Sequence, residues 1–268
     1  APTTTTTSTT TTTASTTTTT TLPIPLANWH DFGWSTSYLA DDNSGVGDGN
    51  DVETWADGQV AGADLTTPGN APSYDADGCP NGTPAVDFFT NEYAENTALS
   101  CADGSNRCTV VMIGRWSGTP SNGDTVFAGE GSDVRTEIFT NGSQWKQYAG
   151  GSHVNSSIAV DTKFRAIVWD LDGTTGGTTP WTVDTDSENS DAGPNAPTSG
   201  ITIGANRYGN SGFADFDYCA IGLYEGDATA DGQWSNLQQY VCDTWGLELG
   251  DTCVPSPATT TTTSTSTT

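Results

Sequence analysis

Three carboxylates at alternate positions are the first residues whose types and spacing could do chemistry. In VDTDSE, Asp184, Asp186 and Glu188 would share one face of a strand, because successive strand side chains point to opposite faces. Hydrolysis of a glycosidic bond with retention needs two carboxyl groups about 5 to 5.5 Å apart, which such positions can supply. NSDAGPNAP follows at once, however, and this composition indicates a hairpin tip rather than the floor of a cleft. We therefore predict no catalytic residue and no enzymatic activity, with a glucanase as the least favoured alternative.

Nucleophilic catalysis finds no support elsewhere in the sequence. The chain contains no GxSxG motif, and its two histidines, His30 and His153, stand in no recognisable catalytic context. We predict that both are surface residues.

Tryptophan is abundant enough to suggest a surface that stacks on sugar rings, with 9 residues in the chain. A place in the core is the more common fate of Trp in a β-sandwich, and we predict it for Trp116, Trp169 and Trp181. Trp145 and Tyr148, in GSQWKQYAG, are the candidates for exposed contacts to a glycan.

An acidic loop at residues 39–53 offers oxygen ligands for a cation. Its candidate ligands are Asp41, Asp42, Asp48 and Asp51. An EF-hand register from Asp42 to Glu53 would place Val46 at a ligand position, which argues against that motif. We predict that no cofactor is required, and Ca²⁺ held by these aspartates in another geometry is the alternative to a solvated turn.

The 6 cysteines predict three disulfides in an oxidising, extracellular compartment. Zinc is the rival interpretation, but the chain has no CxxC pair. Two short loops could close locally, which would leave one long-range pair. The predicted disulfides are then Cys101–Cys108, Cys242–Cys253 and Cys79–Cys219.

Glycans are predicted at two kinds of site. NxS/T sequons stand at Asn81, Asn141 and Asn155. Residues 1–22 and 254–268 are dominated by Thr with a little Pro, which is the composition of an O-glycosylated stalk, and a passive linker is the alternative. The predicted O-glycosylation sites are Thr3, Thr4, Thr5, Thr9, Thr10, Thr16, Thr17, Thr259, Thr260 and Thr261.

Charge and hydropathy restrict the partners. With 33 acidic and 7 basic residues, the chain carries a net charge of -26, which repels nucleic acid and anionic membrane surfaces. No stretch reaches the roughly 20 apolar residues that span a bilayer, so we predict no membrane insertion. The chain begins at APTTTT without a basic and apolar leader, and we expect a secreted protein whose signal peptide has been removed.

The elements that position these residues are mostly strands. Apolar runs and alternation predict strands within residues 84–89, 108–116, 124–131, 136–150, 155–173, 201–204 and 215–225. The Asn141-Gly142 pair is the clearest hairpin signal. A helical period appears only after residue 231, where Trp234, Leu237, Val241 and Trp245 fall on one stripe and predict a short helix that covers the sheets. Early core candidates are Trp29, Phe32 and Trp34.

Several stretches carry a family resemblance. They are YLADDNSGVGDGNDVETWADG, APSYDADGCPNGTPAVDF, FRAIVWDLDG, ITIG, FADFDYCAIGLYEG and WSNLQQYVCDTWGL. In this order they resemble laminin G-like domains of the concanavalin A-like lectin/glucanase (jelly-roll) superfamily over residues 23–253. The resemblance implies an all-β, two-sheet antiparallel β-sandwich with one short C-terminal helix and extended Thr-rich tails. Glucanases of this superfamily begin their catalytic pattern with Glu, where this chain has Asp184.

These observations predict a non-enzymatic, extracellular structural glycoprotein module at residues 23–253, between tails at 1–22 and 254–268. Such a module would assemble with copies of itself into a surface filament, layer or appendage through its glycosylated tails. The alternative is a carbohydrate-binding or adhesion module that docks polysaccharide while the tails act as flexible linkers.

Overall fold

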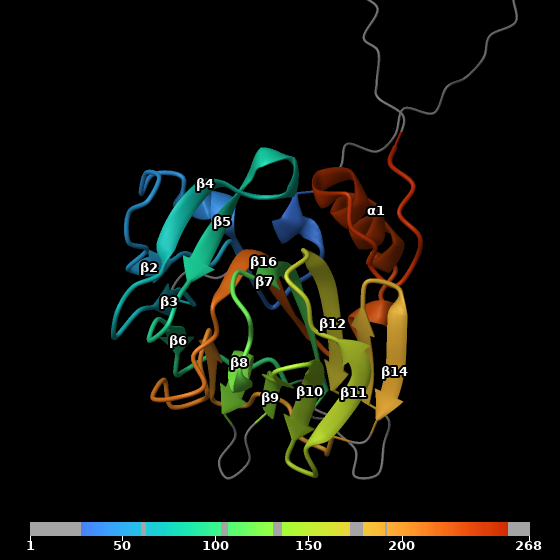
Figure 1. Cartoon of the computed structure of the whole chain (residues 1–268). Coiled ribbons are helices and arrows are strands. Elements are labelled where there is room, and N and C mark those ends of the chain that lie inside the picture. The colour runs from blue at the N-terminus through green and yellow to red at the C-terminus, as the bar shows by residue number, and fades with distance from the viewer. Residues whose placement is uncertain are drawn as a thin grey trace, which may run out of the picture.

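The computed structural model describes residues 28–59, 63–102, 107–130, 136–171, 179–190 and 192–256 (Figure 1). The Thr residues predicted to carry O-glycans lie outside these ranges.

Within the described residues, the strands form two antiparallel sheets that enclose one core, which confirms the predicted β-sandwich. The first sheet has the order β14 (Asp186–Ser190), β13 (Thr179–Val183), β12 (Arg165–Leu171), β7 (Cys108–Trp116), β16 (Phe216–Glu225), β5 (Thr83–Phe88), β4 (Ser73–Cys79), and β1 (Thr36–Leu39) also pairs with β16. The second has the order β11 (Val154–Ala159), β10 (Gln144–Ala149), β9 (Thr136–Asn141), β8 (Asn122–Glu130), β15 (Gly200–Ile203), β6 (Ala94–Asn96), β3 (Leu65–Thr66), β2 (Thr54–Trp55).

The central strand β16 is apolar on both faces because each face is covered. Phe216 and Tyr218 point into the core between the sheets, whereas Cys219 and Ala220 belong to a second apolar cluster on the outside of the first sheet. This two-sided burial explains why the strand has a near-continuous apolar sequence.

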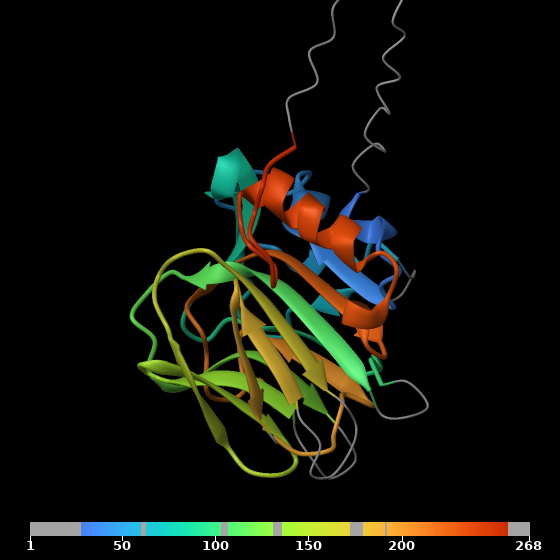
Figure 2. The same ribbon diagram turned by 90° about the vertical axis from the view of Figure 1, so that its right-hand side faces the viewer.

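The outer cluster is covered by α1 (Trp234–Trp245) and by the chain that leads into β1 (Figure 2). Leu237, Val241 and Trp245 on the predicted stripe are buried. The ring of Trp29 meets that of Trp245 edge-on, with centroids 5.8 Å apart. Gly246 ends the helix with φ +68°, a conformation that favours glycine. The predicted helix and its position over the sheet are confirmed.

Both ends of the described chain lie beside α1 (Figures 1 and 2). The N-terminal end enters at Asn28, next to Trp29. The C-terminal segment returns along the helix, where Gln239 Nε2 donates to the carbonyl oxygen of Val254 at 3.1 Å and the N–H of Ser256 donates to Asp243 at 2.7 Å. Strands β8, β9 and β10 lie at the other end of the molecule from α1.

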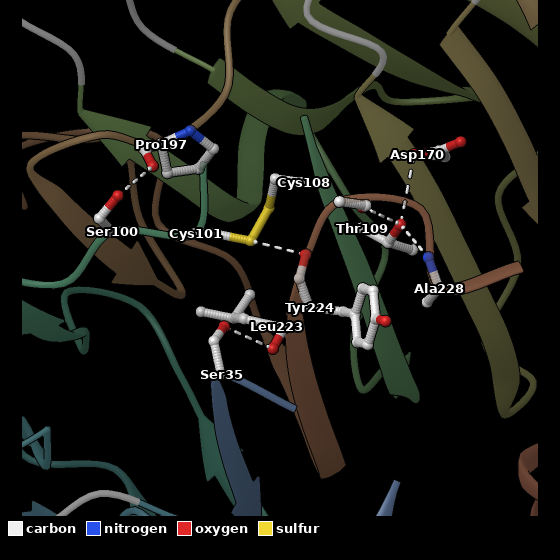
Figure 3. Close-up of a disulfide and its surroundings, with 11 residues drawn as sticks. Ser35, Ser100, Cys101, Cys108, Thr109, Asp170, Pro197, Leu223, Tyr224 and Ala228 are labelled. Carbon is white, nitrogen blue, oxygen red and sulfur yellow. Dashed lines mark hydrogen bonds between the residues drawn. A yellow bond between two sulfur atoms is a disulfide. The ribbon is translucent and has the colours of Figure 1, made fainter. Parts of the chain in front are cut away.

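Three disulfides are present, with the pairings that the sequence predicts. They are Cys79–Cys219, Cys101–Cys108 and Cys242–Cys253, with Cα–Cα distances of 5.9, 5.4 and 5.2 Å. The second closes the loop before β7, and its Cys101 Sγ lies 3.5 Å from the carbonyl oxygen of Tyr224 (Figure 3). Such a set is typical of proteins that fold in an oxidising, extracellular environment.

No helix in the described ranges is long and apolar enough to cross a bilayer.

Candidate functional site

A pocket of about 500 Å³ opens on the outer face of the second sheet, where β8, β9 and β10 meet the loop before β16. We call it the β9 pocket. Its lining residues are Asn122, Gly123, Asp124, Thr125, Glu137, Phe139, Lys146, His153, Asn206, Ser211 and Gly212. The volume lies within the range of small-ligand sites.

Strand alternation brings charged and aromatic groups together on this face. Ile138 points into the core, so its neighbours Glu137 and Phe139 point outward. Lys146 lies directly opposite Phe139 in the register of β10 with β9, and its Nζ is 5.6 Å from the ring centroid. The His153 ring meets the same Phe139 ring edge-on at 5.4 Å. The hairpin therefore supplies an ammonium group, an imidazole, a carboxylate and an aromatic ring.

The loop before β16 forms the second wall of the pocket. The Asn206 side chain organises it by accepting a hydrogen bond from the N–H of Tyr208 at 3.1 Å. The carbonyl of Gly212 accepts from the N–H of Thr125 on β8 at 2.8 Å. A Cβ atom at residue 212 would lie 2.6 Å from the carbonyl oxygen of Gly123, and φ there is +64°, so only glycine permits this close approach.

Two carboxylates give the β9 pocket its negative groups. Glu137 is only 4% exposed although it lies on the outer face. Burial raises the pKa of Asp124, and the charge of Asp215 raises it further, whereas a backbone hydrogen bond from Ser121 opposes the shift. The β9 pocket therefore combines the carboxylates as hydrogen-bond acceptors, the Lys146 ammonium group as a cationic donor, and the edge of the Phe139 ring. This combination suits a ligand that has both hydroxyl groups and apolar C–H surface.

The prediction that Trp145 is an exposed contact to a glycan is wrong. Trp145 is 2% exposed and packs between Trp116 and Trp181, with ring centroids 5.6 and 5.9 Å away. Tyr148 lies three positions further along β10 and therefore points to the opposite, outer face, where its half-buried ring meets His153 at 4.8 Å. The two candidates thus never share a surface, although Tyr148 lies next to the β9 pocket. The core positions predicted for Trp116, Trp169 and Trp181 are confirmed.

The acidic loop at 39–53 does not gather its aspartates around one point. Asp42 pairs with His30, and Asp48 accepts a hydrogen bond from the N–H of Ala76 at 3.1 Å. Asp51 forms an isolated bridge with Ser73. Across the part of the chain that the structure describes, no group of three or more His, Cys, Asp or Glu side chains could hold a metal ion. Ca²⁺ binding by this loop stays a prediction.

The turn of a hairpin sets Asp184 of VDTDSE apart from Asp186 and Glu188, which lie on β14. Val183 pairs with Asp186 in the β13–β14 hairpin, so Asp184 lies in the turn with φ +53° and not on a strand face. Asp184 forms an ion pair with Arg165, whereas Glu188 accepts a hydrogen bond from the N–H of Ser157 at 2.7 Å. The hairpin tip predicted for this segment is confirmed. Asp186 and Glu188 share one face of β14, but Asp184 does not lie on that face, so the three carboxylates are not aligned as the sequence suggested.

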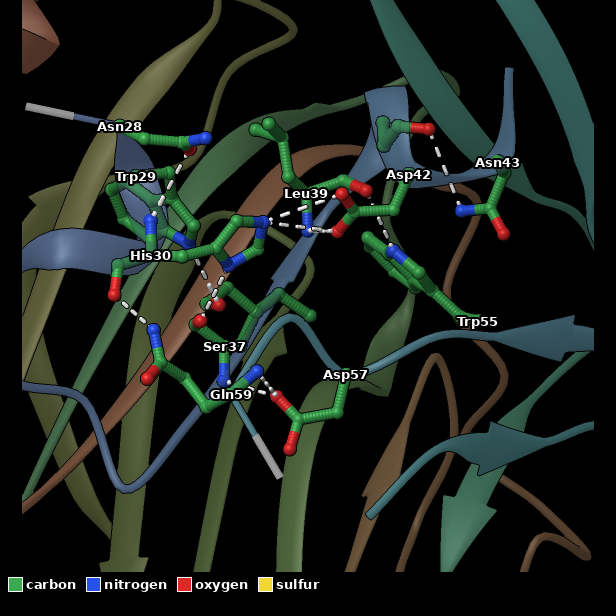
Figure 4. A network of polar contacts seen from close by, with 12 residues as sticks. Asn28, Trp29, His30, Ser37, Leu39, Asp42, Asn43, Trp55, Asp57 and Gln59 are labelled. Atoms are coloured by element: carbon green, nitrogen blue, oxygen red, sulfur yellow. Dashed lines mark hydrogen bonds and ion pairs between the residues drawn. The ribbon is translucent and has the colours of Figure 1, made fainter. Parts of the chain in front are cut away.

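A Ser, a His and an Asp do meet elsewhere, in a network that the sequence did not indicate (Figure 4). Ser37 Oγ lies 2.7 Å from His30 Nδ1, and Asp42 lies 3.2 Å from His30 Nε2. This order resembles a nucleophile, base and acid, but Ser37 is 0% exposed. A Cβ atom at Gly58 would lie 2.1 Å from the imidazole, so the backbone covers the ring. The arrangement joins the loop at residues 57–59 to β1.

His30 is therefore not the surface residue that the sequence predicts, whereas His153 is exposed. The hydrogen bond that His30 donates to Asp42 raises the pKa of His30, against the opposing effect of burial.

A second buried polar cluster lies on the outer face of the first sheet. Asp87 on β5 is directly opposite Asp217 on β16, and Arg115 Nε donates to Asp217 Oδ2 at 2.7 Å. Burial, followed by the charges of Asp217 and Asp75, raises the pKa of Asp87 from 3.8 to about 7, while Arg115 opposes the shift. Burial also raises the pKa of Asp217, but the hydrogen bond and charge of Arg115 and the hydrogen bond with Asp87 oppose that shift, so Asp87 is the carboxyl that holds the proton.

Asp87→Asn should make the protein more stable at pH 8 and flatten its pH dependence. Between pH 3.8 and about 7 the folded state binds more protons than the unfolded state, so the free energy of unfolding falls as pH rises through this window. An Asn amide can donate to Asp217 at every pH. We expect a gain on the order of 1 kcal/mol at pH 8, reduced by partial exposure of the site, and none at pH 4. Urea unfolding at pH 8 and at pH 4 measures this gain. An equal gain at the two pH values would contradict the assignment of the proton to Asp87.

The three sequons lie in different surroundings. Asn81 is exposed in a 3-10 turn (Pro80–Gly82), and Asn155 is exposed on β11 at the edge of the second sheet. Asn141 begins the β9–β10 turn, which confirms the hairpin, and its Oδ1 accepts hydrogen bonds from the N–H groups of Ser143 and Gln144. Glycosylation of all three stays a prediction.

The sequence prediction missed Glu137, Phe139 and Lys146. A usable signal was present, because Asn141-Gly142 marks the hairpin and the alternation in TEIFTNGSQWKQYAG puts Glu137 and Phe139 on one face. The sequence alone could not have placed Asn206 in the same site, because its loop is distant in sequence from β9.

Comparisons with known proteins define the class of the fold. No family model matches the chain. Domain 4 of AbnA, a GH43 extracellular arabinanase from Geobacillus stearothermophilus solved with arabinotriose, is similar, with a TM-score of 0.52 and 12% identity over 72% of this chain and 92% of that chain. Trypanosoma rangeli sialidase gives a TM-score of 0.52 and 12% identity, with 78% and 32% covered.

A third similar structure is the binding domain of botulinum neurotoxin DC in complex with rat synaptotagmin II, with a TM-score of 0.51 and 11% identity over 81% of this chain and 55% of that chain. The chain spans less than two thirds of the sialidase and neurotoxin chains. At these identities the likeness shows the β-sandwich fold alone. The laminin G-like assignment stays a prediction.

Proposed function

We propose that the chain is an extracellular carbohydrate-binding module and that the β9 pocket takes the sugar. The observation that carries the proposal is the meeting of Glu137, Lys146 and the Phe139 ring in one concave site. A sugar presents hydroxyl groups, which need fixed donors and acceptors, together with apolar C–H faces that pack against an aromatic ring. The three groups supply both requirements.

Binding without hydrolysis is the activity we propose. The carboxylates of VDTDSE belong to a hairpin, and Ser37 beside His30 is buried. Domain 4 of AbnA has a similar fold and was solved with arabinotriose, which supports a sugar ligand for such a sandwich. The net charge of -26 favours a neutral glycan over a polyanionic one, because like charges repel at long range.

Lys146→Ala should weaken glycan binding about tenfold to a hundredfold, since a hydrogen bond from a charged donor contributes about 1.5 to 3 kcal/mol. A glycan array identifies the ligand, and isothermal titration calorimetry measures its affinity. Lys163→Ala is the matched control, because it removes the same charge from an exposed position outside the pocket. An array without signal, or equal losses for both variants, would contradict the proposal.

A structural subunit of a filament or surface layer, assembled through the Thr-rich tails, is our second proposal. It is favoured by the position of both ends of the described chain beside α1, which leaves the other end of the sandwich uncovered by them. Electron microscopy of the full chain distinguishes filaments from free modules. If the full chain stayed monomeric at every salt and calcium concentration, this second proposal would be contradicted, whereas the proposal of a carbohydrate-binding module would not be affected.

A further inference from the structure

A second pocket lies under α1, away from the β9 pocket. It has a volume of about 290 Å³, and Gly82 and Thr83 form one side of it. Tyr240, Thr244 and Trp245 from α1 form the other side. Trp245 Nε1 donates to Thr83 Oγ1 at 3.0 Å, which fixes one ring against the opposite wall. The pocket is near the lower end of the volumes of small-ligand sites, and it combines two aromatic rings with hydroxyl groups.

A sequon forms the rim of this α1 pocket. Gly82 and Thr83, which line it, are the second and third residues of the sequon that begins at Asn81. Asn81 is exposed and has φ +62°, and its Nδ2 donates to the carbonyl oxygen of Thr244 at 2.8 Å. The nitrogen that would carry a glycan is therefore held against a residue that lines the pocket.

Glycosylation is compatible with this hydrogen bond. The Nδ2 atom of asparagine has two N–H groups, and attachment of a sugar replaces only one of them. A glycosyltransferase of the secretory pathway would form the bond from Nδ2 to the anomeric carbon of a lipid-linked pyrophosphate donor. The bond from that carbon to the pyrophosphate oxygen breaks, the pyrophosphate leaves with the electron pair, and the amide proton is taken up by a base. The remaining N–H of Asn81 can still donate to Thr244.

We propose that an N-linked glycan on Asn81 places its first sugar in the α1 pocket, where the sugar packs against Tyr240 and Trp245. The glycan then belongs to the layer that covers the first sheet. Aromatic rings suit the apolar face of an N-acetylhexosamine, and the hydroxyl of Thr83 and the backbone of Thr244 suit its polar edge. Asn155 offers a matched comparison, because it is exposed on an edge strand and lines neither pocket.

The test uses the full chain secreted from cells that attach high-mannose N-glycans. Native protein is digested with an endoglycosidase that cleaves beyond the first sugar, and site-resolved mass spectrometry follows each sequon. We expect the Asn81 glycan to be trimmed at least tenfold more slowly than the Asn155 glycan in the folded protein, and at the same rate after reduction and denaturation. Nuclear Overhauser contacts from the N-acetyl methyl group to the Tyr240 and Trp245 rings distinguish a sugar in the pocket from simple crowding.

An unmodified Asn81 in this secreted protein overturns the proposal. So does a modified Asn81 whose sugar shows no contact with either ring, whatever its rate of trimming. Neither result bears on the β9 pocket.

Discussion

The double variant Cys79→Ala, Cys219→Ala lacks one disulfide, and we expect its free energy of unfolding to be about 4 to 5 kcal/mol lower than that of the unmodified protein. The bond joins β4 to the central strand β16 across a sequence separation of 140 residues. Its loss frees a long loop in the unfolded chain, and the entropy of that loop grows with its length. Urea unfolding under non-oxidising, metal-free conditions measures the change.

The Cys101–Cys108 pair is the matched control for this result. Both of its cysteines are fully buried, so substitution by Ala leaves comparable packing defects, but the separation is only 7 residues. The same chain-entropy relation gives about 2.5 kcal/mol for this shorter loop. Equal losses for the two double variants would show that packing and not loop closure dominates at Cys79–Cys219.

Trp145→Ala should cost about 3 to 5 kcal/mol of stability, because it removes a large buried ring from a tightly packed aromatic group. Between the two sheets, the centroid of its ring lies 5.6 Å from that of Trp116 and 6.5 Å from that of Phe216. Any loss of glycan binding in this variant should follow from unfolding. Thermal and urea unfolding test the first expectation, and binding by the folded fraction tests the second.

Tyr148→Ala provides the comparison on the same strand. Tyr148 is half-buried on the outer face, so we expect less than about 1 kcal/mol of destabilisation. If Trp145→Ala abolished binding while its stability matched that of Tyr148→Ala, the inward position of Trp145 would be contradicted.

The strands and the helix could be predicted because their periods are strong and local. The near-continuous apolar run of β7 and the two apolar faces of β16 mark strands covered on both sides. The stripe that ends at Trp245 marks α1, and Gly246 provides the stop. The disulfides could be predicted as well. Once Cys101–Cys108 and Cys242–Cys253 are assumed to close their short loops, Cys79 and Cys219 can pair only with each other.

The site could not be predicted to the same extent, because it depends on which face of a strand turns inward. GSQWKQYAG alternates in a way that fits either face, and only the packing of Trp145 against Trp116 decides between them. The contact between Gly212 and Thr125 joins segments far apart in the chain, and no local pattern specifies it. The same holds for Asp87 and Asp217, whose pairing follows from the order of the strands in the sheet.

The position of both chain ends beside α1 has a mechanical consequence. Tension applied through the two ends would enter near Trp29, whose indole N–H donates to the carbonyl of Ile221 on β16, and leave through the segment that Cys253 bonds to Cys242. The shortest path for that force runs through the helical layer and avoids β8, β9 and β10. Under a pull that begins to detach this layer, the β9 pocket would keep its shape, and the covalent bond at Cys242 would limit how far the C-terminal segment peels from the helix.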